Sequence, residues 1–209
     1  MKKVITEGDV LAAYTNGSKF LTVDKNVLIT PLAKDKIKEL NIILQEELPI
    51  VKEYKTKQNI IVVGCDHTGL QLKEVLKSIL IEKSYCIIDV GTNDEKSCDY
   101  PDFAIAVAQK VIADEADFGI IVDATGIPSA ITANKIPGIR AATCYNEFTA
   151  WSARNHNDAN IMVLGAKAIG DETAKSILKK WLETEFEGGR HQKRLDKISA
   201  LERKLLGNS

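Results

Sequence analysis

The stretch IIVVGCDHTGL, residues 60–70, decides the fold of the longer part of this chain. A run of β-branched residues is typical of a strand buried on both faces, and the polar turn after it leads into an amphipathic pattern over residues 70–82. The same alternation continues, with strands predicted at 85–90, 118–123, 139–143 and 161–164 and helices at 102–113, 129–135, 147–155 and 171–183. Strands that alternate with helices predict βαβ units, and therefore a parallel sheet covered by helices on both faces.

The chain is predicted to have three parts. Residues 45–58, QEELPIVKEYKTKQ, have no apolar period and are predicted to form a linker. Upstream, residues 1–44 are predicted to form a small α+β extension of αββα type, with helices over 7–14 and 31–40, strands over 20–23 and 27–29, and no internal repeat. Residues 59–209 are predicted to form the main domain, which ends in a C-terminal helix.

Composition excludes several classes of function. The 28 Lys and Arg nearly balance the 29 Asp and Glu, so the net charge of −1 argues against a nucleic-acid binder. The four cysteines show no C-x-x-C pair or zinc-like spacing, which argues against a metal site. No apolar run approaches the ~18 residues of a membrane span, and a reducing, cytoplasmic setting is the default expectation.

Polar residues follow the predicted strands, at the carboxyl ends where parallel sheets bind ligands. Asp66 and His67 follow the first strand, and either they face a ligand or Asp66 or Thr68 caps the next helix. After the third strand, the segment DATGIPS, residues 123–129, offers backbone N–H groups and Thr125 for an oxyanion or phosphate. From spacing alone, the simpler interpretation of this segment is an ordinary strand-to-helix turn.

The tail FEGGRHQKR, residues 186–194, predicts a phosphate site. Arg190 and Arg194 are spaced i, i+4 and share one helix face, which suits a doubly charged phosphate. A solvated basic face or an RNA-binding patch is the alternative, but the lack of interleaved aromatic residues favours a small-molecule phosphate.

His156 and Asn157 precede the fifth strand, so they are predicted at the opposite edge of the sheet. If they serve the same chemistry, a second subunit or an unusual turn must complete the site.

Seven blocks of sequence, taken in order, resemble the ribose-5-phosphate isomerase B and galactose-6-phosphate isomerase family. The resemblance runs from about residue 59 to 198, and the blocks are GCDHTG at 64–69, DYPD at 99–102, TG at 125–126, ANK at 133–135, GIRA at 138–141, HNDAN at 156–160 and the tail 188–194. The resemblance implies a Rossmann-like, three-layer αβα fold with a five-stranded parallel sheet. It also implies aldose–ketose isomerisation of a phosphorylated sugar through a cis-enediolate, without a metal or organic cofactor.

By this resemblance, each site is shared between two subunits. Asp66 would contact sugar hydroxyls, His67 would help to hold the phosphate, and Tyr100 would line the site. His156 would assist ring opening and Asn157 would orient the enediolate, both from the partner subunit.

Arg190 and Arg194 would likewise bind the phosphate from the partner. A homodimer or homotetramer is therefore expected.

The sequence departs from the family at the catalytic base. Many members carry Cys-Gly-Thr-Gly-x-Gly after the third strand, with the cysteine as base, whereas this chain has Asp123 there, followed by Thr125, Gly126 and Pro128. Asp123 would replace the cysteine as base if burial raised its pKa. Alternatively, because an Asp here resembles one subunit of galactose-6-phosphate isomerase, the chain is a half-site subunit that completes the active site of a Cys-bearing homologue.

The N-terminal extension, with ITE at 5–7 and LITPLA at 28–33, resembles short segments attached to enzymes of bacterial microcompartments. This resemblance suggests a targeting or assembly role. A simple extension that stabilises the dimer is the alternative.

Overall fold

The computed structural model describes residues 4–15, 17, 20–23, 27–46 and 59–207. The chain forms two compact units, residues 1–56 and 57–209. The linker predicted at 45–58 lies outside the described residues except at 45–46, which belong to a strand of the first unit.

A five-stranded parallel sheet forms the centre of the second unit, as predicted. Its strands are β5 (Ile60–Cys65), β6 (Cys86–Asp89), β7 (Phe118–Asp123), β8 (Ala141–Thr143) and β9 (Ile161–Gly165), in the spatial order β6-β5-β7-β9-β8. All neighbouring pairs are parallel, so the five carboxyl ends lie at one edge.

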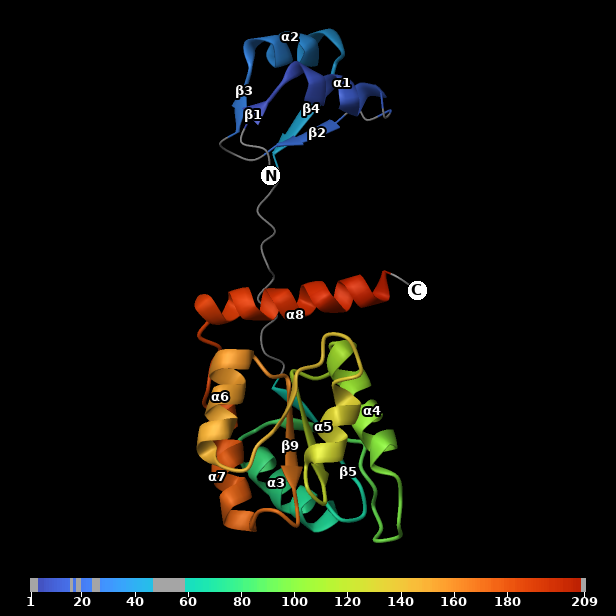
Figure 1. Cartoon of the computed structure of the whole chain (residues 1–209), viewed down its shortest axis with the longest axis vertical. Helices are drawn as coiled ribbons and strands as arrows, with labels where there is room; N and C mark the ends of the chain where they lie inside the picture. The colour runs from blue at the N-terminus through green and yellow to red at the C-terminus, as the bar shows by residue number, and fades with distance from the viewer. Residues whose placement is uncertain (1–3, 16, 18–19, 24–26, 47–58, 208–209) are drawn as a thin grey trace. The chain divides into compact units, whose positions relative to one another are not determined.

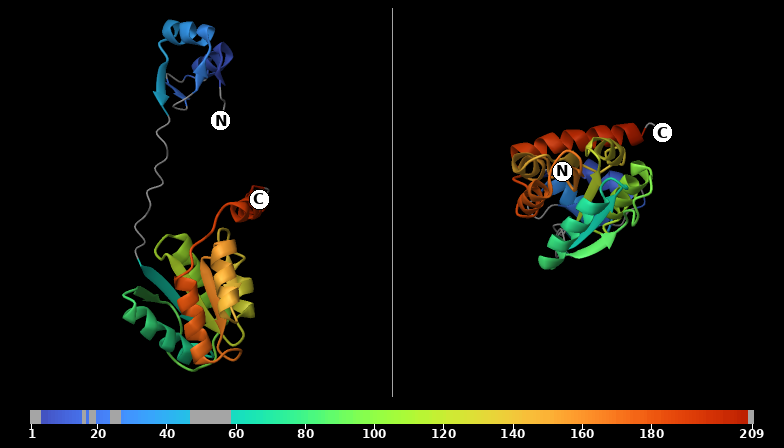
Figure 2. Two further views of the ribbon diagram at one scale, coloured as in Figure 1. Left: turned by 90° about the vertical axis from the view of Figure 1, so that its left-hand side faces the viewer. Right: turned by 90° about the horizontal axis from the view of Figure 1, so that it is seen from below.

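Helices cover both faces of this sheet (Figures 1 and 2). On one face, α3 (Leu70–Glu82), α6 (Glu147–Asn157) and α7 (Asp171–Leu182) bury apolar residues against Ile61 and Val63. On the other face, α4 (Tyr100–Ile112) and α5 (Ile127–Ala133) pack against Val62. Alternate residues of one strand thus enter two cores, which confirms the three-layer αβα prediction.

The C-terminal helix α8 (Arg190–Leu206) crosses the amino-terminal end of the sheet. In Figure 1 the arrow of β9 points away from α8. Leu195 of α8 is buried, and the backbone N–H of Gly138, before β8, donates to Glu202 of α8 at 3.3 Å. The first turns of α8 therefore lie at the end of the sheet opposite to the carboxyl ends of the strands. Among the described residues, no helix is long and apolar enough to cross a membrane.

The first unit has more strands than the sequence predicts. It comprises β1 (Val4–Ile5), α1 (Glu7–Thr15), β2 (Phe20–Val23), β3 (Leu28–Ile29), α2 (Pro31–Glu39) and β4 (Ile43–Glu46), with β1 parallel to β3 and β2 parallel to β4. The αββα prediction missed β1 and β4.

The two halves of this unit have the same order of elements, a strand, a helix and a second strand. β3 and α2 begin 24 residues after β1 and α1. Thr6 and Thr30 occupy equivalent places before the two helices, and the Thr30 hydroxyl accepts a hydrogen bond from the N–H of Ala33. The two halves share little more than an Ile-Thr pair, so repetition of the backbone is not evident in the side chains.

Candidate active site

The turn after β5 is closed by the side chain of Asp66. This carboxyl group is buried, and its Oδ1 accepts hydrogen bonds from the N–H and hydroxyl of Thr68, at 2.8 and 2.6 Å, and from the N–H of Gly69 at 3.2 Å. Asp66 thus closes the turn that precedes α3, whereas the helix itself has Gly69 as its N-cap and no side-chain cap. These bonds use Oδ1 and not Oδ2, so closing the turn is compatible with a contact between Oδ2 and a ligand hydroxyl.

His67 joins this turn to the loop before α4. The backbone N–H of Cys98 donates to its Nδ1 at 3.3 Å, and the Cys98 thiol lies 3.8 Å from the same nitrogen. Because Nδ1 accepts that bond, the neutral imidazole carries its proton on Nε2. Tyr100 begins α4 two residues after Cys98, so the chain places it at the same edge of the sheet.

The loop after β7 binds the side chain of its own first residue. Asp123 is 1% exposed, and its Oδ1 accepts hydrogen bonds from the N–H groups of Thr125, at 2.8 Å, and Gly126. Its Oδ2 accepts from the N–H of Ser129 at 3.1 Å. The N–H groups that the sequence offered to an oxyanion or phosphate are therefore occupied by the Asp123 carboxylate.

Two side chains, one at the end of β8 and one just after it, hold this loop in place. The hydroxyl of Thr143 donates to the carbonyl of Gly126 at 2.8 Å, and the hydroxyl of Tyr145 donates to the carbonyl of Thr125 at 3.0 Å. Gly126 has φ +82°, and a Cβ there would lie 2.7 Å from the Thr143 methyl carbon. The loop thus requires glycine at this position for both its backbone conformation and its space.

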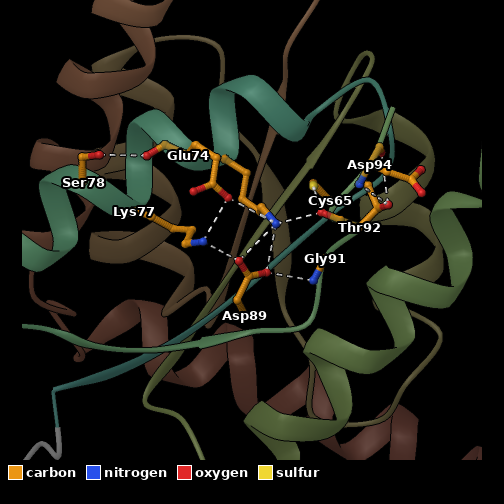
Figure 3. Close-up of polar contacts among 9 residues, drawn as sticks. Cys65, Glu74, Lys77, Ser78, Asp89, Gly91, Thr92 and Asp94 are labelled. Atoms are coloured by element: carbon orange, nitrogen blue, oxygen red, sulfur yellow. Dashed lines mark hydrogen bonds and ion pairs between the residues drawn. The ribbon is translucent and has the colours of Figure 1, made fainter. Parts of the chain in front are cut away.

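A buried lysine that the sequence did not single out supports the loop after β6. Lys73 is fully buried on α3, and its Nζ donates to Asp89 Oδ1 at 3.1 Å and to the carbonyl of Thr92 at 2.9 Å. Figure 3 shows Asp89 bonded also to Lys77, at 2.6 Å, and to the N–H of Gly91, at 3.0 Å. Burial alone would raise the pKa of Asp89, but the hydrogen bonds from Lys77, Gly91 and Lys73 outweigh it and lower that pKa.

Basic and aromatic side chains gather at the opposite end of the sheet. The imidazole rings of His156, near the end of α6, and His191, in the first turn of α8, stack with their centroids 4.2 Å apart and their planes 4° apart. Arg190 Nε donates to His191 Nε2 at 3.2 Å, and an Arg194 guanidinium nitrogen lies 3.4 Å from His191 Nδ1. The sequence prediction gave no role to His191, although it lies in the tail that drew attention to the two arginines.

Asn157 ends α6 beside this group. Its side-chain amide donates to the carbonyl of Ser152 at 3.0 Å, and its own carbonyl accepts from Arg140 Nε at 3.1 Å. The Ser152 hydroxyl in turn lies 3.3 Å from His156 Nδ1. His156, Asn157, Arg190 and Arg194 therefore belong to one end of the unit; together with His191 they are called the basic cluster.

The basic cluster and the loop of Asp123 lie at opposite ends of the same sheet. Asp123 pairs with Gly165 at the end of β9, whereas α6 ends before β9 begins at Ile161. The four residue steps of β9 span about 13 Å at about 3.3 Å per residue. One copy of the chain therefore does not bring all of its predicted site residues together.

The fold and these two polar ends define a parallel α/β protein with polar loops at the carboxyl ends of its strands, where such sheets bind ligands, and a cluster of basic side chains at their amino ends. The profile of a family described as Ribose/Galactose Isomerase matches residues 61–198. The chain belongs to this family.

Relatives and solved structures agree with this assignment. The chain is 42% identical over 144 residues to ribose-5-phosphate isomerase B of Escherichia coli, which covers 69% of this chain and 97% of the relative. It is 41% identical over 141 residues to galactose-6-phosphate isomerase subunit LacA of Lactococcus lactis, covering 68% and 98%. The structure of ribose-5-phosphate isomerase B from Clostridium thermocellum matches with a TM-score of 0.69 at 45% identity, and covers 70% of this chain and 99% of that one.

Proposed function

We propose that this protein interconverts an aldose and a ketose that carry a phosphate group, either ribose 5-phosphate and ribulose 5-phosphate or a hexose 6-phosphate pair. The observation that carries the proposal is that one chain of this isomerase family holds both a polar strand-end site and a separate basic cluster. Relatives that this chain matches over nearly their whole length are named as isomerases of sugar phosphates, which supports the same reaction class here.

The reaction moves two protons within the sugar, one from C2 to C1 and one from the C2 oxygen to the C1 oxygen. A base takes the proton from C2 of the open-chain aldose, and the electrons of that C–H bond form the enediolate. The C1 oxygen takes a proton, the C2 oxygen gives one up, and return of a proton to C1 gives the ketose. Asp66 and Tyr100 hold the sugar, Asn157 orients the enediolate, and His156 assists ring opening, while His67, Arg190 and Arg194 hold the phosphate.

We infer that a second copy of the chain brings the two ends together in a homodimer, which in turn can form a homotetramer. A groove of about 530 Å³ lies beside the basic cluster and is lined largely by apolar residues, among them Phe148 and Ile198. Phe148 is 70% exposed and Ile198 is 50% exposed, so both offer apolar surface to a partner. Asn157 lines the same groove, which makes the apolar surface continuous with the basic cluster and favours a partner copy over an unrelated protein.

The geometry of Asp123 favours a second candidate function. Three backbone N–H groups bind its buried carboxylate, so those donors are not free for a substrate oxyanion and the carboxylate has one lone-pair direction left. In this second candidate function, the chain supplies the basic cluster to the active site of a Cys-bearing homologue. Its own site at the carboxyl ends of the strands does not catalyse the reaction. A heteromer of the two chains is then the working enzyme.

We further propose that the first compact unit, which includes β4, is a separate module attached to an isomerase domain over 59–209. The relatives cover about two thirds of this chain, so the module is an addition to the enzyme. A targeting or assembly role in a bacterial microcompartment fits such a module, and the isomerase otherwise works in the cytoplasm.

Incubation of the purified protein in deuterated water tests the proposed reaction. Ribose 5-phosphate, allose 6-phosphate and galactose 6-phosphate are each followed by NMR for loss of the exchangeable C–H signal. We expect deuterium incorporation into one of them. Binding of these sugar phosphates without exchange in any of them would refute the homomeric enzyme and favour the half-site subunit.

A further inference from the structure

His191 is the buried centre of the basic cluster. It is 4% exposed, and three side chains of the proposed site contact its ring: His156 by stacking at 4.2 Å, Arg190 by a hydrogen bond at 3.2 Å, and Arg194 at 3.4 Å. A polar ring buried among residues that bind a ligand either fixes their positions or binds the ligand itself.

The contact with Arg190 determines which ring nitrogen carries the proton. A guanidinium group can only donate, so His191 Nε2 must accept the bond from Arg190 Nε and carry no proton. The neutral ring then has its proton on Nδ1. Burial, together with the charges of His156, Arg190 and Arg194, lowers the pKa of His191, while Glu187 opposes that shift, so the neutral ring prevails at pH 7.

In this tautomer, two hydrogen-bond donors face each other without an acceptor between them. Nδ1–H of His191 faces a guanidinium nitrogen of Arg194 at 3.4 Å, and both groups are donors. An anion placed between them would accept from both, and a phosphate oxygen has the lone pairs to do so. The free basic cluster is thus arranged for an acceptor that the protein itself does not supply at this contact.

A metal ion fits the same cluster poorly. His156, Glu187 and His191 offer ligand atoms within 4.8 Å of one another. However, the two rings are stacked face to face with planes 4° apart, so their in-plane lone pairs do not converge on one point between them. The two arginines add positive charge beside His191, which disfavours a cation and favours an anion.

The same ring also sets the orientation of His156. One face of the His156 imidazole stacks on His191, and Trp151 approaches its ring edge-on with the centroids 4.7 Å apart. His156 therefore contacts two aromatic rings, which restrict the orientation of its plane for the role that the proposed function gives it.

We propose that His191 is a further phosphate-binding residue, which donates from Nδ1 to the phosphate, holds Arg190 through Nε2, and orients His156. This inference rests on the proposed function for the identity of the substrate, a sugar phosphate, but the anion site itself is testable without turnover.

Inorganic phosphate is the probe, with the full-length protein and calorimetric titration. His191→Leu removes both polar atoms at similar volume, and we expect its phosphate affinity to fall about tenfold or more, since a hydrogen bond to a charged group is lost. His191→Asn places an amide donor near the position of Nδ1, and we expect it to keep most of the affinity. Equal phosphate affinity in wild type and His191→Leu, or no phosphate binding by wild type, would overturn the proposal.

Nitrogen-15 NMR of wild type gives a second readout that does not depend on the folding of a variant. The chain has only three histidines, so the imidazole signals are readily assigned. We expect His191 to show an unprotonated Nε2 and to shift on addition of phosphate. A protonated Nε2 on His191 would contradict the inference. Sugar phosphates that bind without deuterium exchange, together with His191-dependent phosphate binding, would refute the isomerase proposal and leave the anion site standing.

Discussion

The carboxylate of Asp123 accepts a hydrogen bond from the backbone N–H of Ser129 at 3.1 Å. Together with the bonds from the N–H groups of Thr125 and Gly126, this contact folds the loop after β7 around the Asp123 carboxylate. The residue that the sequence predicts as the catalytic base is therefore also the residue that holds the loop together. Its structural and its chemical contributions can be separated by substitution.

Asp123→Asn is expected to destabilise the second unit by about 1–3 kcal/mol, because the amide turns a donor toward backbone N–H groups that have lost their acceptor. Urea unfolding measures the change. Asp117→Asn is the matched control, since Asp117 accepts a single backbone bond, from Ile60 at 3.0 Å, which the amide oxygen can keep. Equal effects of the two substitutions would contradict the role of Asp123 in closing the loop.

The same variant tests the chemistry. If Asp123 is the base, Asp123→Asn abolishes deuterium exchange with the accepted sugar phosphate. Exchange at the wild-type rate in the folded variant would show that another group removes the proton.

Lys73→Met is expected to cost about 3 kcal/mol of unfolding free energy, at the low end for a broken buried ion pair because Asp89 keeps Lys77. Lys77→Met, whose side chain is 22% exposed, is the control and should cost about 1 kcal/mol or less. A fully tolerated Lys73→Met would show that the network of Figure 3 does not stabilise the loop after β6.

Asp89 makes the stability of the folded state depend on pH. Its pKa is lowered from the ordinary 3.8, so it stabilises the folded state above that pH and loses this contribution as the pH falls through the lowered value. Lys73→Met should weaken this acid dependence, which unfolding experiments between about pH 2 and 5 would measure.

Thiol reactivity should divide the four cysteines into two pairs. Burial raises the pKa of Cys65 to about 11 and that of Cys144 to about 12, so both stay protonated and inaccessible near neutral pH. Cys86 is exposed and Cys98 is partly exposed. We expect a thiol reagent to label Cys86 and Cys98 in the native protein and all four after unfolding. Rapid native labelling of Cys65 would contradict the packing described for β5.

Phe148→Asp tests the groove as the dimer surface. Burial of a phenylalanine contributes roughly 1.5–3 kcal/mol, and a symmetric interface loses it twice, so the dimer should dissociate. Light scattering after gel filtration should show half the wild-type mass. Ile81→Asp, at an exposed site on α3, is the control and should keep that mass. An unchanged mass for Phe148→Asp would exclude this groove as the dimer interface.

The parallel sheet was predictable because each buried strand is a short apolar run between amphipathic helices, and β7 and α3 have the predicted bounds. The edge strand β8 is shorter than predicted and all of its residues are only partly buried, so its apolar pattern is weaker. The strands β1 and β4 were missed because a strand of two residues, or one next to a charged stretch, carries little pattern. Whether a polar residue lies at the carboxyl or the amino end of the sheet could also be predicted, because this depends only on whether the residue follows or precedes its strand.

Two features of the site were not predictable from the sequence. That Asp123 binds its own loop depends on a rotamer and on N–H directions that spacing does not specify. The role of His191 depends on contacts between α6 and α8, which no local pattern encodes. In both cases the segment predicted from the sequence contains the residue, and tertiary packing decides which contacts its side chain makes.

Mixing two inactive variants tests the central claim, that a second copy completes each site. Asp66→Asn alters only the strand-end site and Arg194→Ala only the basic cluster, and a random mixture of refolded subunits contains one intact site in each mixed dimer. The account predicts that each variant alone loses most isomerase activity and that the mixture recovers about a quarter of the wild-type activity. No recovery, although mass analysis shows that mixed dimers form, would contradict a site shared between two copies.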